Sequence, residues 1–300
     1  MDLTSLTPLA GGWSGETFVA DVAGERSVVR IYARPSHRGD AAHEVDAALL
    51  HLVRGLVPVP EVLEVRRAVP ASDLPALLVT SYLPGERADL LLPRLDDRRR
   101  AELGAHLGDL LADLGGMPQL KAGPFIDGDL AVGSFTAAGE PPLDGLPAMV
   151  QLVESSLAWW TPEELDGLRE VAVEAQALLD TVGRCCLVHS DFNPKNLLVD
   201  PDSLAVTGLL DWEYAHAGHP FTDLGNLLRF ERSDVFTDAV LEAYVARRGG
   251  TASEALALAR AADLWALLDL APRRADNPVA QEADRLLRAI ARTRDPGATP

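Results

Sequence analysis

The feature that most constrains this 300-residue chain is a short polar segment enclosed by two apolar runs. Apolar residues at 185–188 and again from 197 onward predict two strands. Between these strands, Asp191 precedes Asn196 by five residues, and fifteen residues after Asn196 a further apolar run ends in Asp211. Carboxylate and amide oxygens are the ligands that hard divalent cations prefer. We therefore expect this segment to be the chemical centre of the protein.

The same three side chains suit phosphoryl transfer from a nucleoside triphosphate to a hydroxyl group. One carboxylate, Asp191, would hold the acceptor hydroxyl near the γ-phosphorus and take its proton. Asn196 and Asp211 would hold Mg²⁺ against the phosphates. Loss of Asp211 is then expected to remove metal binding, whereas loss of Asp191 should spare nucleotide binding and abolish transfer.

The motif His189-x-Asp191-x4-Asn196, followed by Asp211-Trp212-Glu213, resembles the aminoglycoside phosphotransferase family. That family consists of kinase-like enzymes and includes choline, fructosamine and macrolide kinases. His-Gly-Asp is its commoner motif, and this chain departs from it at Ser190. The resemblance implies an α+β, protein-kinase-like bilobal fold, with an antiparallel sheet and one helix in the N-terminal lobe and a mostly helical C-terminal lobe. It also implies ATP or GTP and Mg²⁺ as cofactors.

Hydrophobic periodicity along the chain fits this division. Residues 11–32 predict a β-hairpin, residues 39–54 a helix, and residues 62–69 and 76–82 two further strands. We expect residues 1–85 to form a nucleotide-binding lobe with a hinge near 81–85, and residues 86–300 to form the catalytic and substrate lobe. A loop region is expected between about 118 and 146. The long helices predicted in the second lobe are 96–114, 163–179, 233–246, 253–270 and 281–291.

The resemblance also assigns nucleotide-binding roles in the first lobe. The glycine-rich segment 11–17, with the Ser14 hydroxyl, would hold phosphate oxygens. Arg30 stands where the phosphate-pairing lysine of kinases lies. Glu44, central in the predicted helix, would pair with Arg30. Two neighbouring positions in the same helix are His43 and Asp46.

Further roles follow from the same resemblance. The backbone carbonyl of Ser81 and the N–H of Leu83 would bind adenine at the hinge. Asp223 would brace the catalytic loop, and His189 would be a structural hydrogen-bonding group in that loop.

The charge of the chain bears on its partners. The formal net charge is −18, which disfavours nucleic acid and anionic membrane surfaces as partners. Residues 1–90 hold 12 acidic and 8 basic residues, a charge of −4, and residues 91–300 hold 33 and 19, a charge of −14. The acidic lobe favours a cationic small molecule as the acceptor. Candidate substrate-binding acids in that lobe are Glu213, Glu231, Asp234, Asp238 and Asp269, with Tyr214 and Trp265 as possible stacking faces.

These observations predict an ATP- and Mg²⁺-dependent O-phosphotransferase that acts on a cationic antibiotic and confers resistance. The acidic lobe fits an aminoglycoside or a basic cyclic peptide of the viomycin and capreomycin type as the acceptor. The chain as a whole, including the segment Gly11–Thr17, also resembles actinomycete antibiotic kinases. One alternative is a small-metabolite kinase acting on choline, homoserine or a sugar. A second alternative, from another class, is a nucleotide-binding pseudokinase.

Two further features concern the compartment. The only cysteines, Cys185 and Cys186, are adjacent and apolar in context, which favours two buried thiols in a reducing environment. The N-terminal residues show no signal-peptide pattern, and no window of about 18 apolar residues lacks a charge. We therefore expect a cytoplasmic enzyme with no obligate protein partner.

Overall fold

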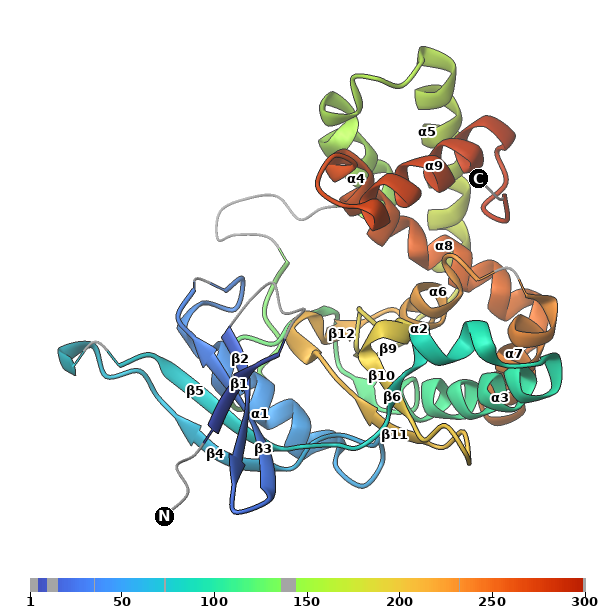
Figure 1. Cartoon of the computed structure of the whole chain (residues 1–300). Coiled ribbons are helices and arrows are strands. Elements are labelled where there is room, and N and C mark those ends of the chain that lie inside the picture. Colours follow the sequence, from blue (N-terminus) through green and yellow to red (C-terminus); the bar gives the residue numbers. More distant parts are fainter. Residues whose placement is uncertain are drawn as a thin grey trace.

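The computed structural model describes residues 5–9, 16–34, 36–72, 74–135, 144–231 and 233–298. It has two lobes, with the strands of the N-terminal lobe at one end and the helices of the C-terminal lobe at the other (Figure 1). The chain passes between the lobes through residues 82–85, which link the last strand of the N-terminal sheet to the first short strand of the second lobe. The predicted bilobal α+β fold is confirmed.

The N-terminal lobe contains a five-stranded sheet in the order β1-β2-β3-β5-β4, with every neighbouring pair antiparallel. The predicted hairpin is β2 and β3, which turn at Ala23 and Gly24, both with positive φ. The first strand, β1, was not predicted. The five strands are β1 (Ser5–Pro8), β2 (Glu16–Val22), β3 (Glu25–Tyr32), β4 (Val62–Arg66) and β5 (Ala76–Ser81).

One helix, α1 (Ala42–Val53), packs against β4 and β5 of this sheet and follows a short 3-10 turn, η1 (Gly39–Ala41). Its buried face carries Val45, Leu49 and Val53, none of them exposed, at the three- and four-residue spacing of a helix. This face orients the helix and thereby fixes which of its polar residues face the second lobe.

Short strands carry the polar segment of the second lobe. β9 (Cys185–Val188) precedes it, β10 (Leu197–Val199) follows it, and β11 (Val206–Leu209) leads to Asp211. β10 pairs with β11 and with β6 (Glu86–Arg87), which continues from the inter-lobe linker. β9 pairs with β12 (His216–Gly218), and the short strands β7 (Pro118–Gln119) and β8 (Gly123–Pro124) complete that sheet.

The helices of the second lobe begin at capping residues that the sequence supplies. Thr161 and Thr251 each form a capping box with the glutamate three residues later, and Asp96 accepts a hydrogen bond from the N–H of Arg99. The helices are α2 (Ala88–Leu91), α3 (Asp97–Leu114), α4 (Gly145–Glu154), α5 (Pro162–Leu179), α6 (Thr222–Leu228), α7 (Asp234–Arg248), α8 (Ala252–Leu270) and α9 (Pro278–Thr293).

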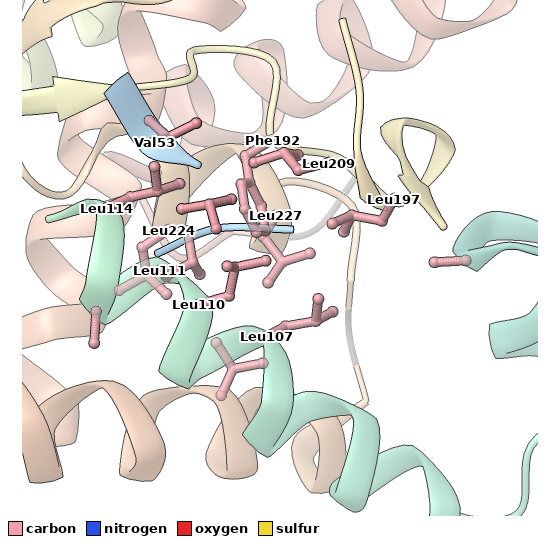
Figure 2. Close-up of a cluster of buried hydrophobic side chains, with 14 of the residues drawn as sticks. Val53, Leu107, Leu110, Leu111, Leu114, Phe192, Leu197, Leu209, Leu224 and Leu227 are labelled. Atoms are coloured by element: carbon pink, nitrogen blue, oxygen red, sulfur yellow. The ribbon is translucent and has the colours of Figure 1, made fainter. Parts of the chain in front are cut away.

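Two hydrophobic clusters stabilise the molecule. The first joins α1, α3 and the strands around the polar segment; Figure 2 shows leucines of α3 beside Phe192, Leu197 and Leu209. The second is formed by α4, α5, α8 and α9. Because Phe192 and Leu197 are fully buried in the first cluster, the backbone on both sides of the polar loop is anchored.

The packing of α3 against α7 depends on two glycines one turn apart. A Cβ atom at Gly104 would lie 2.9 Å from the carbonyl oxygen of Phe236, and one at Gly108 would overlap the carbonyl oxygen of Val240. The absence of side chains at these positions therefore allows the two helix backbones to approach closely.

Three sequence expectations need comment. The loop expected between 118 and 146 contains β7 and β8 and ends at Gly145, where α4 starts, while residues 136–143 lie outside the described part of the chain. Cys186 is buried, but Cys185 is only half-buried, and neither forms a disulfide. Within the described ranges, no helix is both long enough and apolar enough to span a bilayer.

Candidate active site

The loop that follows β9 contains a backbone conformation that side chains rarely adopt. Ser190 has a φ of 67°, in the left-handed region, at the position where glycine is the commoner residue of the motif. A non-glycine residue there costs roughly 1–2 kcal/mol, so the surrounding contacts must hold it. The backbone strain therefore lies at Ser190, the residue directly before Asp191.

Asp223 supplies those contacts. Its buried carboxylate, at the start of α6, accepts hydrogen bonds from the backbone N–H groups of His189 (2.8 Å) and Ser190 (2.7 Å). Burial raises the pKa of Asp223 to about 6, while the two backbone hydrogen bonds oppose that rise. The predicted bracing contact between Asp223 and the catalytic loop is present.

His189 is fully buried beneath the loop. Its Nε2 lies 2.9 Å from the carbonyl oxygen of Leu210, and its Nδ1 accepts a hydrogen bond of 3.3 Å from the N–H of Asp191. These partners require the Nε2–H tautomer. Burial lowers the pKa of His189 to about 4, so the ring is neutral at pH 7. The ring therefore links the loop to the strand before Asp211, as predicted for a structural hydrogen-bonding group.

Two asparagine amides fix the carboxylate of Asp191. The Nδ2 of Asn193 donates to Oδ1 at 2.6 Å, and the Nδ2 of Asn196 donates to Oδ2 at 2.7 Å. Lys195 lies 3.4 Å from Oδ2, and 23% of the Asp191 side chain remains exposed. The carboxylate is thus oriented by the protein and still accessible to a substrate.

Asn196 is buried and also donates from Nδ2 to the backbone carbonyl of Asp191 at 2.9 Å. Since both of these contacts use the amide nitrogen, the Oδ1 atom is the part of the side chain suited to a cation. The backbone carbonyl of Asn196 accepts the N–H of Leu210 at 2.8 Å. This contact places Asn196 and Asp211 on neighbouring segments.

Asp211, like Ser190, has a left-handed backbone, at φ 66° and ψ 64°. Partial burial raises its pKa to about 6, the neighbouring Glu213 adds to the rise, and Arg30 opposes it. Excess negative charge of this kind is relieved by a bound cation, so one amide oxygen and one carboxylate fit Mg²⁺ that also binds phosphates. Among the described residues, no three His, Cys, Asp or Glu side chains form a metal site by themselves.

Arg30 reaches the site from β3. One terminal nitrogen, Nη2, lies 2.5 Å from Glu213, and Nη1 lies 3.5 Å from Asp211 and 3.8 Å from Asp46. The predicted pairing of Arg30 with Glu44 is wrong. Glu44 lies two positions earlier on α1 and therefore points to another side of the helix, where it binds Arg67.

The sequence prediction also missed Arg38. Its guanidinium is buried, binds Asp46, and donates to the carbonyl oxygens of Trp212 (2.9 Å) and Ala215 (2.7 Å). The hydroxyl of Tyr32 donates to Asp46 at 2.6 Å. Asp46 is therefore the acidic residue of α1 that faces the second lobe. The sequence did contain a signal for this residue. Position 46 lies four residues after Ala42 and three before Leu49, which places it on the buried face of the helix.

At the linker between the lobes, Ser81 is paired with Glu61 of the segment before β4. The Ser81 N–H donates to the Glu61 carbonyl at 2.8 Å, and the Glu61 N–H donates to the Ser81 hydroxyl at 2.9 Å. Within the described residues, the N–H of Leu83 has no hydrogen-bond acceptor. It is therefore suited to an acceptor atom of a ligand. Ser14 lies outside the described residues.

The predicted substrate-binding acids do not form one cluster. Glu213 forms an ion pair with Arg30, which reaches it from β3 of the N-terminal lobe. Asp269 is exposed on α8 and binds Arg273 one turn later. Glu231 accepts the N–H of Ser233 at 2.7 Å, directly before α7. Asp234 lies in the first turn of α7.

The predicted stacking residues also differ in position. Tyr214, which is 52% exposed, stacks on His37 with ring centroids 5.3 Å apart. Partial burial raises the pKa of Tyr214, and the negative charges of Glu213 and Asp191 add to that rise. Trp265 packs against the second hydrophobic cluster.

The fold is shared with solved phosphotransferases. Wild-type aminoglycoside 2′-phosphotransferase-IIIa in complex with GDP is 17% identical, with a TM-score of 0.68 over 98% of this chain and 94% of that chain. A thermostable mutant of aminoglycoside phosphotransferase APH(4)-Ia, in complex with ADP and hygromycin B, is 20% identical, with a TM-score of 0.62 over 99% and 95%. At these identities the similarity establishes the fold.

Curated relatives match only in part. Acyl-CoA dehydrogenase family member 11 from Mus musculus is 43% identical over 53 residues, 18% of this chain and 7% of that protein. Family member 10 from the same species is 26% identical over 218 residues, 71% of this chain and 19% of that protein. The matched part of the chain thus spans less than a fifth of the length of these relatives.

The family itself is established by a broader match. The sequence model of the phosphotransferase enzyme family covers residues 5–264, which include the N-terminal lobe, the second lobe as far as α8, and the loop around Asp191. The chain therefore belongs to the phosphotransferase enzyme family.

Proposed function

We propose that this phosphotransferase transfers the γ-phosphoryl group of ATP or GTP to a hydroxyl group of a small molecule. The observation that carries the proposal is the fixed carboxylate of Asp191, whose two oxygens accept hydrogen bonds from Asn193 and Asn196 while the side chain stays partly exposed. A carboxylate held in this way can orient a hydroxyl without reorganising during the reaction.

In the proposed reaction, Asp191 accepts the proton of the acceptor hydroxyl as its oxygen attacks the γ-phosphorus. The new O–P bond forms while the bond from the γ-phosphorus to the β–γ bridging oxygen breaks, and the nucleoside diphosphate leaves with that electron pair. Arg30 would bind phosphate oxygens. Bound Mg²⁺, which Asn196 and Asp211 would hold, supplies neutralisation of the phosphate charge.

The base of the nucleotide would bind at the linker between the lobes. The N–H of Leu83, which has no acceptor among the described residues, would donate to the base, and the carbonyl of Ser81 would accept from it. This donor and acceptor match the ring nitrogen and amino group of adenine, whereas guanine would have to bind in another orientation. Nucleoside triphosphates are abundant in the cytoplasm, where we propose that the enzyme acts.

For the acceptor we propose a cationic antibiotic, an aminoglycoside or a basic cyclic peptide, with resistance as the result. Support comes from the charge of −14 over residues 91–300, which attracts cations to that lobe. Addition of a phosphate would cancel positive charge on the antibiotic.

A small-metabolite acceptor such as choline, homoserine or a sugar is the second candidate, and a specific observation favours it. Two of the acids expected to bind a cationic substrate are already paired with arginines, Glu213 with Arg30 and Asp269 with Arg273. This pairing reduces the negative charge available to a polycationic acceptor.

A coupled ADP-release assay over both classes of acceptor tests the proposal. Asp191→Asn should abolish turnover and retain nucleotide binding, whereas the exposed Asp202→Asn should behave as the wild type. Growth of cells that express the wild type or Asp191→Asn in the presence of each antibiotic tests resistance. Turnover of neutral metabolites alone would exclude the antibiotic, and nucleotide binding without turnover of any acceptor would identify a pseudokinase.

A further inference from the structure

A buried arginine outside the proposed reaction joins the two lobes beside Asp211. Arg38 lies between β3 and α1, and its side chain is only 3% exposed. Burying a guanidinium is costly unless its N–H groups find acceptors, so the partners of Arg38 are the reason for its position.

Those partners come from both lobes. Nη1 binds the carboxylate of Asp46 on α1, and Nη2 donates to the carbonyl oxygens of Trp212 (2.9 Å) and Ala215 (2.7 Å). These two carbonyls bracket the 3-10 turn η6 (Trp212–Tyr214), which begins at the residue after Asp211. One planar group thus holds the beginning and the end of that turn.

The other side of Asp211 is held by a strand contact. The N–H of Leu210 donates to the carbonyl of Asn196 at 2.8 Å, at the end of the β10–β11 pair. Asp211 itself adopts the left-handed conformation, which an aspartate keeps only where its surroundings impose it. The residue is therefore fixed between a strand contact before it and the Arg38 contacts after it.

A second contact comes from the same loop. His37, the neighbour of Arg38, stacks on Tyr214 with an angle of 3° between the ring planes. Two consecutive residues of the β3–α1 loop therefore contact the turn after Asp211, one through carbonyls and one through a ring.

We propose that Arg38 is a positioning residue that sets the orientation of Asp211 and thereby the affinity of the enzyme for divalent metal. The proposal rests on the proposed function, because it takes Asp211 as a metal ligand. Without Arg38, the carbonyls of Trp212 and Ala215 lose their contacts to the guanidinium, and among the described residues Asp46 keeps Arg30 and Tyr32 as partners. Outer contacts of this kind alter metal affinity by about 10- to 100-fold.

The test compares Arg38→Met with Arg38→Lys and with Arg34→Met, an exposed arginine of the same loop. Mn²⁺ binding in the presence of ADP is measured by electron paramagnetic resonance, and the Mg²⁺ dependence of turnover is measured on the best acceptor. We expect Arg38→Met to weaken Mn²⁺ binding and raise the half-saturating Mg²⁺ concentration at least tenfold, with most of kcat recovered at saturating Mg²⁺. Arg38→Lys keeps the positive charge but lacks the planar guanidinium, so its Mn²⁺ affinity and half-saturating Mg²⁺ concentration should lie between those of the wild type and Arg38→Met.

A purely structural role predicts another pattern. If Arg38→Met lowers the melting temperature or kcat but leaves both metal constants within twofold of those of Arg34→Met, the proposal is overturned. If Arg38→Met does not fold but Arg38→Lys does, Arg38→Lys is compared with Arg34→Met instead. Metal constants within twofold of each other would then overturn the proposal. Failure of the wild type to turn over any acceptor while it binds Mn²⁺–ADP would instead contradict the proposed function, and the binding comparison would still decide the role of Arg38.

Discussion

Arg30 binds the carboxylate of Glu213 at 2.5 Å, so a side chain of β3 is tied directly to the turn that follows Asp211. A triphosphate that uses Arg30 must compete with Glu213 for the guanidinium. Asp46 contacts the other terminal nitrogen and can keep Arg30 oriented during that exchange.

Substitution of the two acidic residues of α1 should therefore have unequal effects. Asp46→Asn removes a charged partner of both Arg30 and Arg38, and we expect the KM for nucleotide to rise about tenfold, equivalent to about 1.4 kcal/mol. Glu44→Gln removes only the exposed contact with Arg67 and should change KM less than twofold. Steady-state kinetics measures the KM for nucleotide of both variants. Equal increases in KM would contradict the assignment of Asp46, rather than Glu44, as the functional partner of Arg30.

Ser190→Gly should stabilise the protein. Glycine adopts a φ of 67° without steric cost, and the Asp223 contacts use only backbone atoms, so they survive the change. We expect a gain of about 1 kcal/mol, measured by urea unfolding. Ser190→Val should lose stability and activity together. A loss of stability in Ser190→Gly would contradict this prediction. It would show that contacts of the Ser190 side chain stabilise the fold by more than the backbone strain costs.

The partly buried imidazole of His219 should make the fold sensitive to acid. Burial lowers the pKa of His219 to about 4 from an ordinary value near 6.5, and its Nε2 has no hydrogen-bond partner among the described residues. The folded state therefore favours the neutral ring, so its contribution to stability is complete above pH 6.5 and is lost as the pH falls toward 4.

Urea unfolding of the wild type and of His219→Gln at pH 7.5 and pH 5 measures this contribution. We expect the wild type to lose roughly 1–2 kcal/mol more than the variant between the two pH values. The raised pKa of Asp223 acts in the opposite direction in both proteins and cancels in the comparison. The exposed His51→Gln is the control, and parallel pH profiles for wild type and His219→Gln would contradict the prediction.

Gly108→Ala should disrupt the contact between α3 and α7. The added Cβ would overlap the backbone carbonyl of Val240, which cannot move without shifting the helix. We expect a loss of about 2–3 kcal/mol in unfolding free energy. Gly183→Ala, where no atom lies within 4 Å of the new Cβ, is the matched control and should be nearly neutral. Similar melting temperatures for the two variants would show that the helices can separate at little cost.

Much of the architecture could be predicted from periodicity. The helices expected at 96–114, 163–179 and 253–270 occur within one or two residues of their predicted ends, because capping residues mark where they start. In contrast, α4 follows directly after a segment rich in proline and glycine, and those residues obscured its helical pattern.

The site shows the same division between local and distant information. Asp191, Asn196 and Asp211 could be found because they lie at fixed spacing beside apolar strands. Arg38 could not be found in this way, because two of its acceptors are backbone carbonyls 174 and 177 positions further along the chain. Every residue has a backbone carbonyl, so the sequence does not show which carbonyls accept a hydrogen bond. The error at Glu44 arose from comparison with the family, whereas the burial pattern of α1 favours Asp46.

The helix α8 contributes to both hydrophobic clusters, with Ala255 and Ala259 in the first and Leu264 and Leu268 in the second. Figure 1 shows it extending from the group of α4, α5 and α9 toward α6 and α7. Substitutions in α4, α5 and α9 therefore affect the packing of the second cluster and not that of the first. That part of the molecule can thus change by mutation while the interior beneath Asp191 keeps its packing.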